Sequence, residues 1–135
     1  MKKDLFRIID ANLNRAREGL RVCEEVVRFI FNDAELTGEF KKIRHKVSGN
    51  IARFPGSTSA LLKNRSSRED VGRDLAPESA KKSCQDVFTA NSQRVKESLR
   101  VLEEFSGIFD AGLSSDFAKL RFRIYELEKK TIARF

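Results

Sequence analysis

One segment sets the pattern of the whole chain: Asp10-Ala-Asn-Leu-Asn-Arg-Ala-Arg-Glu-Gly-Leu-Arg-Val-Cys-Glu-Glu25. In and around this segment, apolar side chains are spaced by four and then three positions: Ile9, Leu13, Ala16, Leu20, Cys23, Val27 and Ile30. This spacing is typical of an amphipathic helix with one face in a core. We therefore predict a helix from about Asp4 to about Phe31, ended by the pair Asn32-Asp33.

A second pattern in the same segment is polar. Every third residue carries an amide, a guanidinium or a carboxylate, in the order Asn12, Arg15, Glu18, Arg21 and Glu24. On a helix these side chains wind slowly away from one flank of the apolar stripe. A solvated face would not need an amide and two guanidinium groups, because Lys or Glu would serve there equally well. The pattern therefore indicates a specific role.

The segment occurs twice. Residues 90–104 match residues 11–25 at a constant offset of 79, with nine of the fifteen positions identical. The repeated polar residues include Asn91, Arg94, Glu97, Arg100 and Glu103. A further match aligns residues 40–47 with 117–124 at an offset of 77, so that Arg44 corresponds to Arg121. The duplicated unit is thus a helical hairpin, and two hairpins predict four helices about a pseudo-twofold axis, with the long helices antiparallel or crossing near it.

We predict one all-α domain over residues 1–135, a four-helix bundle-like fold of duplicated hairpins with a long central loop. The first repeat covers about 4–54, the loop about 55–79 and the second repeat about 80–135. The loop is longer than an ordinary bundle connection, which is typical of functional or disordered segments. A short helical turn is expected within it at residues 60–62.

The remaining helix boundaries follow from local signals. The second helix is expected from about Ala34 to Arg53. The third should run from about Pro77, a residue suited to a first helical turn, to Ser106. The last should begin at Ser114 or Ser115, good N-caps, and continue to the C-terminus. Gly107 and Gly112 would then bracket the break between the last two helices.

The composition favours an anionic partner. The net charge is +7, which suits nucleic acid, a phosphorylated metabolite or a membrane surface. No apolar run approaches the length of a membrane span and no signal peptide opens the chain, so we expect a cytoplasmic protein without a membrane partner. Cys23 lies on the apolar stripe and is interpreted as a small core residue, and nothing in the spacing pairs it with Cys84.

Two interpretations of the repeated polar residues are open. Asn12, Arg15 and Glu18 with their counterparts could fix the register of packed helices. Alternatively, the two sets converge on one or two anion pockets, where the planar fork of Arg grips phosphate. Arg44 and Arg121 either coat the surface or join such a site. His45 is the only His; a lone His is more often structural, but beside Arg44 it could contact a phosphate or donate a proton.

The central loop contains Arg65 and the triplet Asp70-Val-Gly72. The triplet is either a simple turn or a means of placing a carboxylate near a metal or a substrate hydroxyl. The chain has no Gly-rich phosphate loop, zinc spacing or catalytic-triad pattern. The residues alone therefore indicate a basic, duplicated helical domain with an Arg/Asn/Glu site for an anionic ligand.

The same residues carry a resemblance to a known family. The motifs are Asp10 to Glu25, Ile43-Arg-His45, Asp70-Val-Gly72, Ala90 to Glu104, and Leu120-Arg-x-x-x-Tyr-Glu-Leu-Glu128, where x is any residue. Together they resemble the small, non-classical hydroxymethylpyrimidine phosphate kinases of bacterial thiamine synthesis, which occur alone or fused ahead of thiamine-phosphate synthase. The chain resembles the standalone form. The resemblance implies ATP-dependent phosphorylation of 4-amino-5-hydroxymethyl-2-methylpyrimidine phosphate to the diphosphate, with Mg²⁺.

On this kinase hypothesis the polar residues take separate roles. The catalytic and metal-binding candidates are Glu18, Glu97 and Asp70. The candidates for binding substrate and phosphate are Asn12, Arg15, Arg21, Arg44, His45, Arg65, Asn91, Arg94, Arg100 and Arg121.

The alternative function is a non-catalytic helical module that binds an anionic ligand, nucleic acid or thiamine-phosphate synthase. Acidic residues interleaved with the basic ones argue against nucleic acid, because no basic stripe with aromatics is evident. The narrow apolar stripes of the second and fourth helices leave room for a homodimer.

Overall fold

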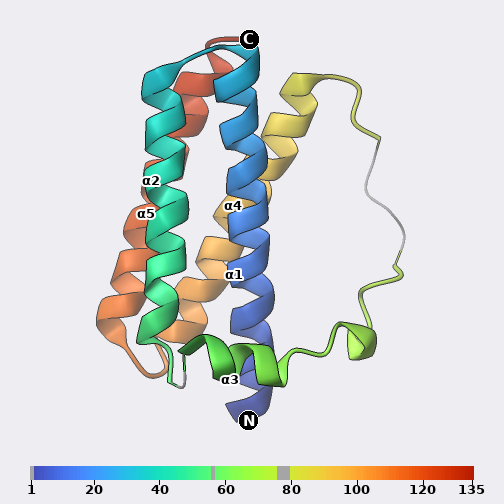
Figure 1. The fold of residues 1–135 in the computed structure, drawn as a ribbon, viewed down its shortest axis with the longest axis vertical. Coiled ribbons are helices and arrows are strands. Elements are labelled where there is room, and N and C mark those ends of the chain that lie inside the picture. Colours follow the sequence, from blue (N-terminus) through green and yellow to red (C-terminus); the bar gives the residue numbers. More distant parts are fainter. Residues whose placement is uncertain (1, 56, 76–79) are drawn as a thin grey trace.

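Four long antiparallel helices form the body of the protein (Figure 1). The computed structural model describes residues 2–55, 57–75 and 80–135, and this part of the chain contains helices and no strand. The long helices are α1 (Lys2–Glu25), α2 (Ala34–Asn50), α4 (Cys84–Ser106) and α5 (Ala111–Ile132). Helix α1 packs on α2 and α4, and α5 packs on α4 and, less extensively, on α2. The all-α fold of duplicated, antiparallel hairpins is confirmed.

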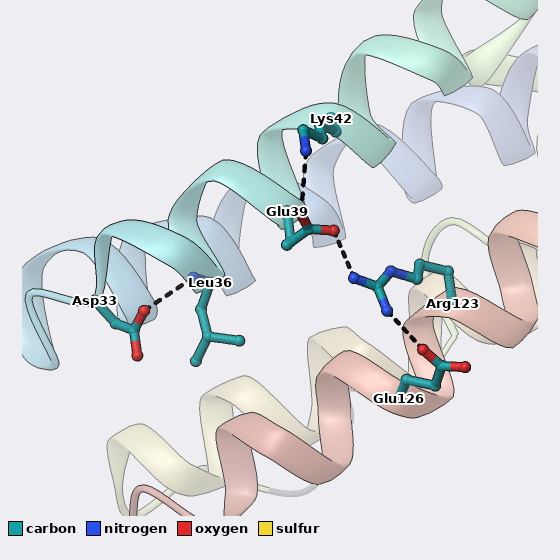
Figure 2. Close-up of polar contacts among 6 residues, drawn as sticks. All are labelled: Asp33, Leu36, Glu39, Lys42, Arg123 and Glu126. Carbon is teal, nitrogen blue, oxygen red and sulfur yellow. Dashed lines mark hydrogen bonds and ion pairs between the residues drawn. The ribbon is translucent and has the colours of Figure 1, made fainter.

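The turn of the first hairpin lies where the sequence predicts it. Helix α1 continues as a π-helix, η1 (Val26–Ile30), before the chain turns. Asn32 has a φ of 49°, in the left-handed region that Asn tolerates better than most residues. The Asp33 carboxylate then caps α2 by accepting a hydrogen bond from the Leu36 backbone N–H at 2.9 Å (Figure 2). A 3₁₀ turn, η2 (Ile51–Arg53), extends the end of α2.

The predicted start of the third helix was wrong. Pro77 lies outside the described residues, but residues 80–83 are not helical. Helix α4 begins at Cys84 instead, because the Ser83 hydroxyl caps it by accepting from the Asp86 backbone N–H at 3.1 Å.

The predicted start of the last helix was also wrong. Asp110, not Ser114 or Ser115, is the N-cap of α5, and its carboxylate accepts from the Leu113 backbone N–H at 2.9 Å. Gly112 consequently lies in the first turn of α5 and not in the break. Asp110 and Leu113 follow Asp33 and Leu36 by 77 positions, so the caps are duplicated with the helices.

The central segment contains more helix than the sequence indicates. Helix α3 (Ser57–Asn64) includes the predicted turn at residues 60–62 and is followed by a 3₁₀ turn, η3 (Ser67–Glu69). Leu61 is buried and belongs to the main core, and α3 packs on α1 (Figure 1). The central segment is therefore attached to the first repeat.

The apolar stripes of the long helices meet in one core. Phe88 of α4 is fully buried and meets the ring of Phe40 edge-on, with centroids 6.0 Å apart. Cys23 is also fully buried, and burial raises the pKa of its thiol to about 12. This confirms the interpretation of Cys23 as a core residue. Within the described residues, no helix combines the length and apolarity needed to cross a bilayer.

A partly buried ion pair between Glu39 and Arg123 joins α2 to α5 near the surface, and a further pair within each helix adjoins it (Figure 2). Arg123 donates to Glu39 at 2.6 Å and to Glu126 at 2.6 Å, while Lys42 donates to Glu39 at 3.2 Å. Hydrogen bonds from Arg123 and Lys42 lower the pKa of the Glu39 carboxyl. Surface pairs of this kind contribute little to stability, so we assign them to the alignment of α5 on α2.

Helices α1 and α4 approach each other closely at Gly19. A Cβ atom added at Gly19 would lie 2.7 Å from Cγ2 of Val95 and 3.1 Å from the backbone oxygen of Asn91. Its counterpart in the second repeat, Ser98, is also small and is buried. Small residues at this crossing let the polar residues of both helices face one space.

Gly19→Ala should therefore lower the free energy of unfolding by about 1–3 kcal/mol, because the added methyl group overpacks the crossing. Gly38→Ala is the matched control, since no atom lies within 4 Å of a Cβ at that position of α2. There, the better helix propensity of Ala should stabilise the protein by up to about 1 kcal/mol. Urea unfolding followed by circular dichroism measures both. A Gly19→Ala variant as stable as the parent would contradict the close approach.

Candidate functional site

A cavity of about 550 Å³ lies between α1 and α4, where the pseudo-twofold axis passes between the repeats. We call it the symmetric cavity. Its lining consists of four pairs related by the offset of 79, together with Val101: Asn12 and Asn91, Arg15 and Arg94, Glu18 and Glu97, Gly19 and Ser98. The structure thus brings together all six of the repeated Asn, Arg and Glu residues predicted to converge.

The two asparagines are held identically in the two repeats. The Asn12 side-chain nitrogen donates to the backbone oxygen of Ile8 at 2.8 Å, and that of Asn91 donates to the backbone oxygen of Val87 at 2.8 Å. Both side chains are largely buried. Each amide nitrogen donates one of its two N–H groups to its own helix, so the amide oxygen can accept from a ligand and the second N–H can donate to it.

The charged residues of the symmetric cavity are exposed. Within residues 2–55, 57–75 and 80–135, no hydrogen bond or ion pair joins the side chain of Arg15 or of Glu18 to another group. Glu97 accepts only from the Gln93 side chain among the described residues, at 3.0 Å. Groups that fixed the register of α1 and α4 would bond each other across the interface. Arg15, Glu18 and Glu97 make no such bond within the described part of the chain, which favours a binding site over a structural network.

A second and larger cavity, of about 730 Å³, adjoins the first. We call it the linker cavity. It shares Asn12, Arg15 and Glu18 with the symmetric cavity. Its other lining residues are Asp4, Arg7, Ile8, Asp10, Ala11, Asn14, Arg65, Ser66, Ser67 and Asp70. The structure thus places two predicted residues of the central segment, Arg65 and Asp70, beside the first-repeat half of the site.

A bidentate ion pair attaches the central segment to α1. Nε of Arg65 lies 2.7 Å from Oδ2 of Asp10, and Nη2 lies 2.8 Å from Oδ1. The Asp10 side chain is only 10% exposed, and its hydrogen bonds raise the pKa of Arg65. Asp70 accepts from the Gly72 backbone N–H at 2.9 Å, so the Asp-Val-Gly triplet forms a turn while Asp70 still lines the linker cavity.

Arg44 and Arg121 lie outside both cavities, and each forms the equivalent ion pair in its own repeat. Arg44 bonds Glu24 through Nε at 2.8 Å and Nη2 at 3.3 Å, and the Glu24 side chain is 3% exposed. In the second repeat, Arg121 bonds Glu103 through Nε and Nη2, both at 3.1 Å. Neither arginine lines the cavities described above. We interpret both pairs as structural links between the two helices of each hairpin.

The other predicted binding residues are also outside these cavities. Arg21 pairs with Glu24 and Glu25, and Arg100 pairs with Glu103 and Glu104. Both arginine side chains are more than half exposed. His45 is exposed on α2. None of these three residues lines the symmetric cavity or the linker cavity.

The carboxylates of the site do not form a metal cage. Among the described residues, no three His, Cys, Asp or Glu side chains are grouped so that they could hold a metal ion. Glu18 and Glu97 line one cavity, and Glu18 and Asp70 line the other. Mg²⁺ at phosphoryl-transfer sites is commonly held by one or two carboxylates and the substrate phosphates. The donor set suits an ion held in that way.

The Glu24–Arg44 pair makes stability depend on pH. Burial alone would raise the pKa of Glu24, but the hydrogen bonds and charge of Arg44, aided by Arg21, hold it below its ordinary value of 4.5. A carboxyl with a lowered folded-state pKa stabilises the fold above its unfolded value, and this contribution disappears as the pH falls through the folded value.

Glu24→Gln should accordingly cost about 2 kcal/mol at neutral pH, because a charge-assisted bond becomes a neutral one. The difference between the parent and Glu24→Gln should shrink as the pH falls below 4.5. Urea unfolding of both proteins at a series of pH values isolates this one carboxyl, since all other groups are shared. A difference that stays constant below pH 4.5 would contradict the lowered pKa.

Several lining residues were missed by the sequence argument. Arg7, Ser66 and Ser67 carry no pattern that distinguishes them from surface residues. Asp10 opens the repeated segment but precedes its matching part, because its counterpart at position 89 is Thr. Gly19 offered a signal: a glycine inside a strongly periodic helix usually marks a close approach.

Comparisons with known proteins identify relatives. The model of the ThiD2 family matches residues 7–130. A thiamine-phosphate synthase of Thermosynechococcus vestitus is 42% identical over 127 residues, which cover 93% of this chain and 34% of the relative. Thiamine-phosphate synthases of Nostoc punctiforme and Rhodopirellula baltica are 39% and 35% identical, over 92% and 95% of this chain and 34% and 35% of their own lengths. The chain spans about a third of the curated relatives it matches. No solved structure matches it.

Proposed function

The chain belongs to the ThiD2 family, and on that premise we propose that it is a kinase of thiamine biosynthesis. The reaction is the phosphorylation of 4-amino-5-hydroxymethyl-2-methylpyrimidine phosphate to the diphosphate, with ATP and Mg²⁺. One observation carries the proposal: a cavity lined by duplicated Asn, Arg and Glu residues between α1 and α4. Guanidinium groups bind phosphate oxygens, and a cavity with one from each repeat suits a reaction that brings two phosphates together.

The phosphoryl transfer requires the protein mainly to orient the two phosphates and to neutralise their charge. An oxygen of the acceptor phosphate forms a bond to the γ-phosphorus of ATP. The bond from that phosphorus to the β,γ-bridging oxygen breaks, and ADP leaves with the electron pair. A phosphate oxygen is already a nucleophile near neutral pH, so no strong general base is required. Orientation of the two phosphates and neutralisation of their charge are the main contributions.

Each residue of the symmetric cavity has a role in this proposal. Arg15 and Arg94 bind phosphate oxygens, and the amide oxygens of Asn12 and Asn91 accept from the 4-amino group or orient the ring. Glu18, together with Glu97 or Asp70, would hold a Mg²⁺ ion bound with the substrate phosphates. When bound, that ion would supply further charge neutralisation.

The names of the relatives support a role in thiamine biosynthesis. Proteins about three times as long as the region they share with this chain are named thiamine-phosphate synthase. We infer that the domain supplies a pyrimidine diphosphate to a thiamine-phosphate synthase, whether the two activities share a chain or not.

An ATP-consumption assay with Mg²⁺ tests the proposal by comparing the pyrimidine monophosphate with the unphosphorylated alcohol. The monophosphate should support turnover, and the alcohol should react at least about a hundredfold more slowly, since it cannot form the charge-assisted bonds to the arginines. Omitting Mg²⁺ should abolish the reaction. Equal turnover of both compounds would contradict the anion-binding role of the cavity, and turnover of neither would contradict the kinase assignment.

A further inference from the structure

The two repeats differ where the central segment packs. Arg65 follows α3 and pairs with Asp10 of the first repeat. The counterpart of Asp10 in the second repeat is Thr89, which has no charge to hold an arginine. The linker cavity therefore adjoins only the first-repeat half of the symmetric cavity. The symmetric cavity is thus joined, on its first-repeat side only, by a second cavity with a different lining, and the two form unlike compartments.

We propose that these compartments are separate subsites: the linker cavity takes the nucleoside triphosphate, and the symmetric cavity takes the phosphorylated pyrimidine. This inference rests on the kinase function proposed above and assigns its two substrates to places.

Size and apolar surface favour this assignment over the reverse. The linker cavity measures about 730 Å³ against about 550 Å³, and the nucleotide is the larger ligand. Three guanidinium groups and four carboxylates line the linker cavity, and the guanidinium of Arg65 is already paired with Asp10. Arg7 and Arg15 are therefore the residues that bind the phosphates of the nucleotide. Ile8 and Ala11 add apolar surface for a base or ribose.

The shared wall is where the two ligands meet. Asn12, Arg15 and Glu18 line both cavities, so phosphates from the two sides approach each other at Arg15. Arg94 is the sequence counterpart of Arg15 but lines the symmetric cavity alone. Two residues that are equivalent in the sequence therefore have different roles. Arg15 contacts both substrates, and Arg94 contacts the pyrimidine phosphate.

Arg65 acts here as a positioning residue. Its bidentate bond to Asp10 uses Nε and Nη2 and fixes the backbone that carries Ser66 and Ser67 against α1. Only the planar fork of Arg makes this two-point attachment, so Lys would keep the charge without the geometry.

Isothermal titration of the full chain with a non-hydrolysable ATP analogue, and separately with the pyrimidine monophosphate, tests the assignment. Arg7→Ala should weaken the analogue at least about tenfold and leave the monophosphate within about twofold. Arg94→Ala should do the reverse, and Arg15→Ala should weaken both. Arg65→Lys should weaken the analogue alone. Arg68→Ala is the matched control, because Arg68 lies in the same segment but outside the lining, and it should leave both affinities unchanged.

The outcomes separate this inference from the function it rests on. If Arg7→Ala weakens the monophosphate and Arg94→Ala the analogue, or if each weakens both ligands equally, the assignment is overturned while a catalytically active parent keeps the kinase function. If the parent protein binds neither ligand, both proposals are overturned. Circular dichroism of each variant confirms that the helices are retained.

Discussion

Replacing Arg15 or Arg94 with alanine is expected to lower kcat/KM for the pyrimidine monophosphate by at least about a thousandfold and to leave the fold intact. Both side chains are exposed at the symmetric cavity, so their removal costs little packing. In a phosphoryl transfer each would neutralise charge that is larger in the transition state than in either separate substrate. Steady-state kinetics, with thermal unfolding to verify the fold, measure this effect.

Arg28→Ala is the matched control for these variants. Arg28 belongs to the π-helical extension of α1 and lies outside the lining of both cavities. Its replacement should leave kcat/KM unchanged. Full activity in both Arg15→Ala and Arg94→Ala would remove the duplicated arginines from the reaction.

Arg44→Met is expected to destabilise the fold by about 3 kcal/mol without impairing turnover by the molecules that remain folded. The substitution leaves the Glu24 carboxylate, whose side chain is 3% exposed, without its two shortest bonds. Arg21 remains 3.4 Å away and compensates in part. The equivalent Arg121→Met should cost less, because the Glu103 side chain is 17% exposed. Urea unfolding and kinetics at low temperature separate the two effects.

A double variant provides the control for the ion pair. Arg44→Met combined with Glu24→Gln should be more stable than Arg44→Met alone, since no charge is then left buried without its partner. If Arg44→Met instead keeps the parent's stability and loses affinity for the monophosphate, Arg44 belongs to the binding site, as the sequence first suggested.

Local periodicity and the duplication made most of the architecture predictable. The apolar spacing from Ile9 to Val27 depends only on helical geometry, and it predicted the buried face correctly. Ile30 was also predicted to be buried but is exposed, because the wider turn of the π-helix η1 moves it off the apolar stripe. The offset of 79 then implied that Asn12 and Asn91 would occupy equivalent places, and the antiparallel crossing of α1 and α4 put them in one cavity. Symmetry thus linked residues far apart in the chain.

The helix boundaries and the ion-pair partners of the arginines were less predictable, because several nearby residues of the same type could serve equally well. Asp110, Ser114 and Ser115 are all good N-caps, and the burial of Leu113 favours Asp110. The arginines posed the same difficulty. Arg15 and Arg44 look alike in the sequence, and only the packing of α1 on α2 shows that Arg44 is bonded to Glu24.

The most direct test of the central claim is phosphorus NMR of the protein incubated with ATP, Mg²⁺ and the pyrimidine monophosphate. For the proposed kinase, the γ-phosphate signal of ATP should disappear while the signals of ADP and of a new pyrimidine diphosphate grow in equal amounts. An ATP signal that persists, or that is replaced by free inorganic phosphate alone, would contradict the kinase function.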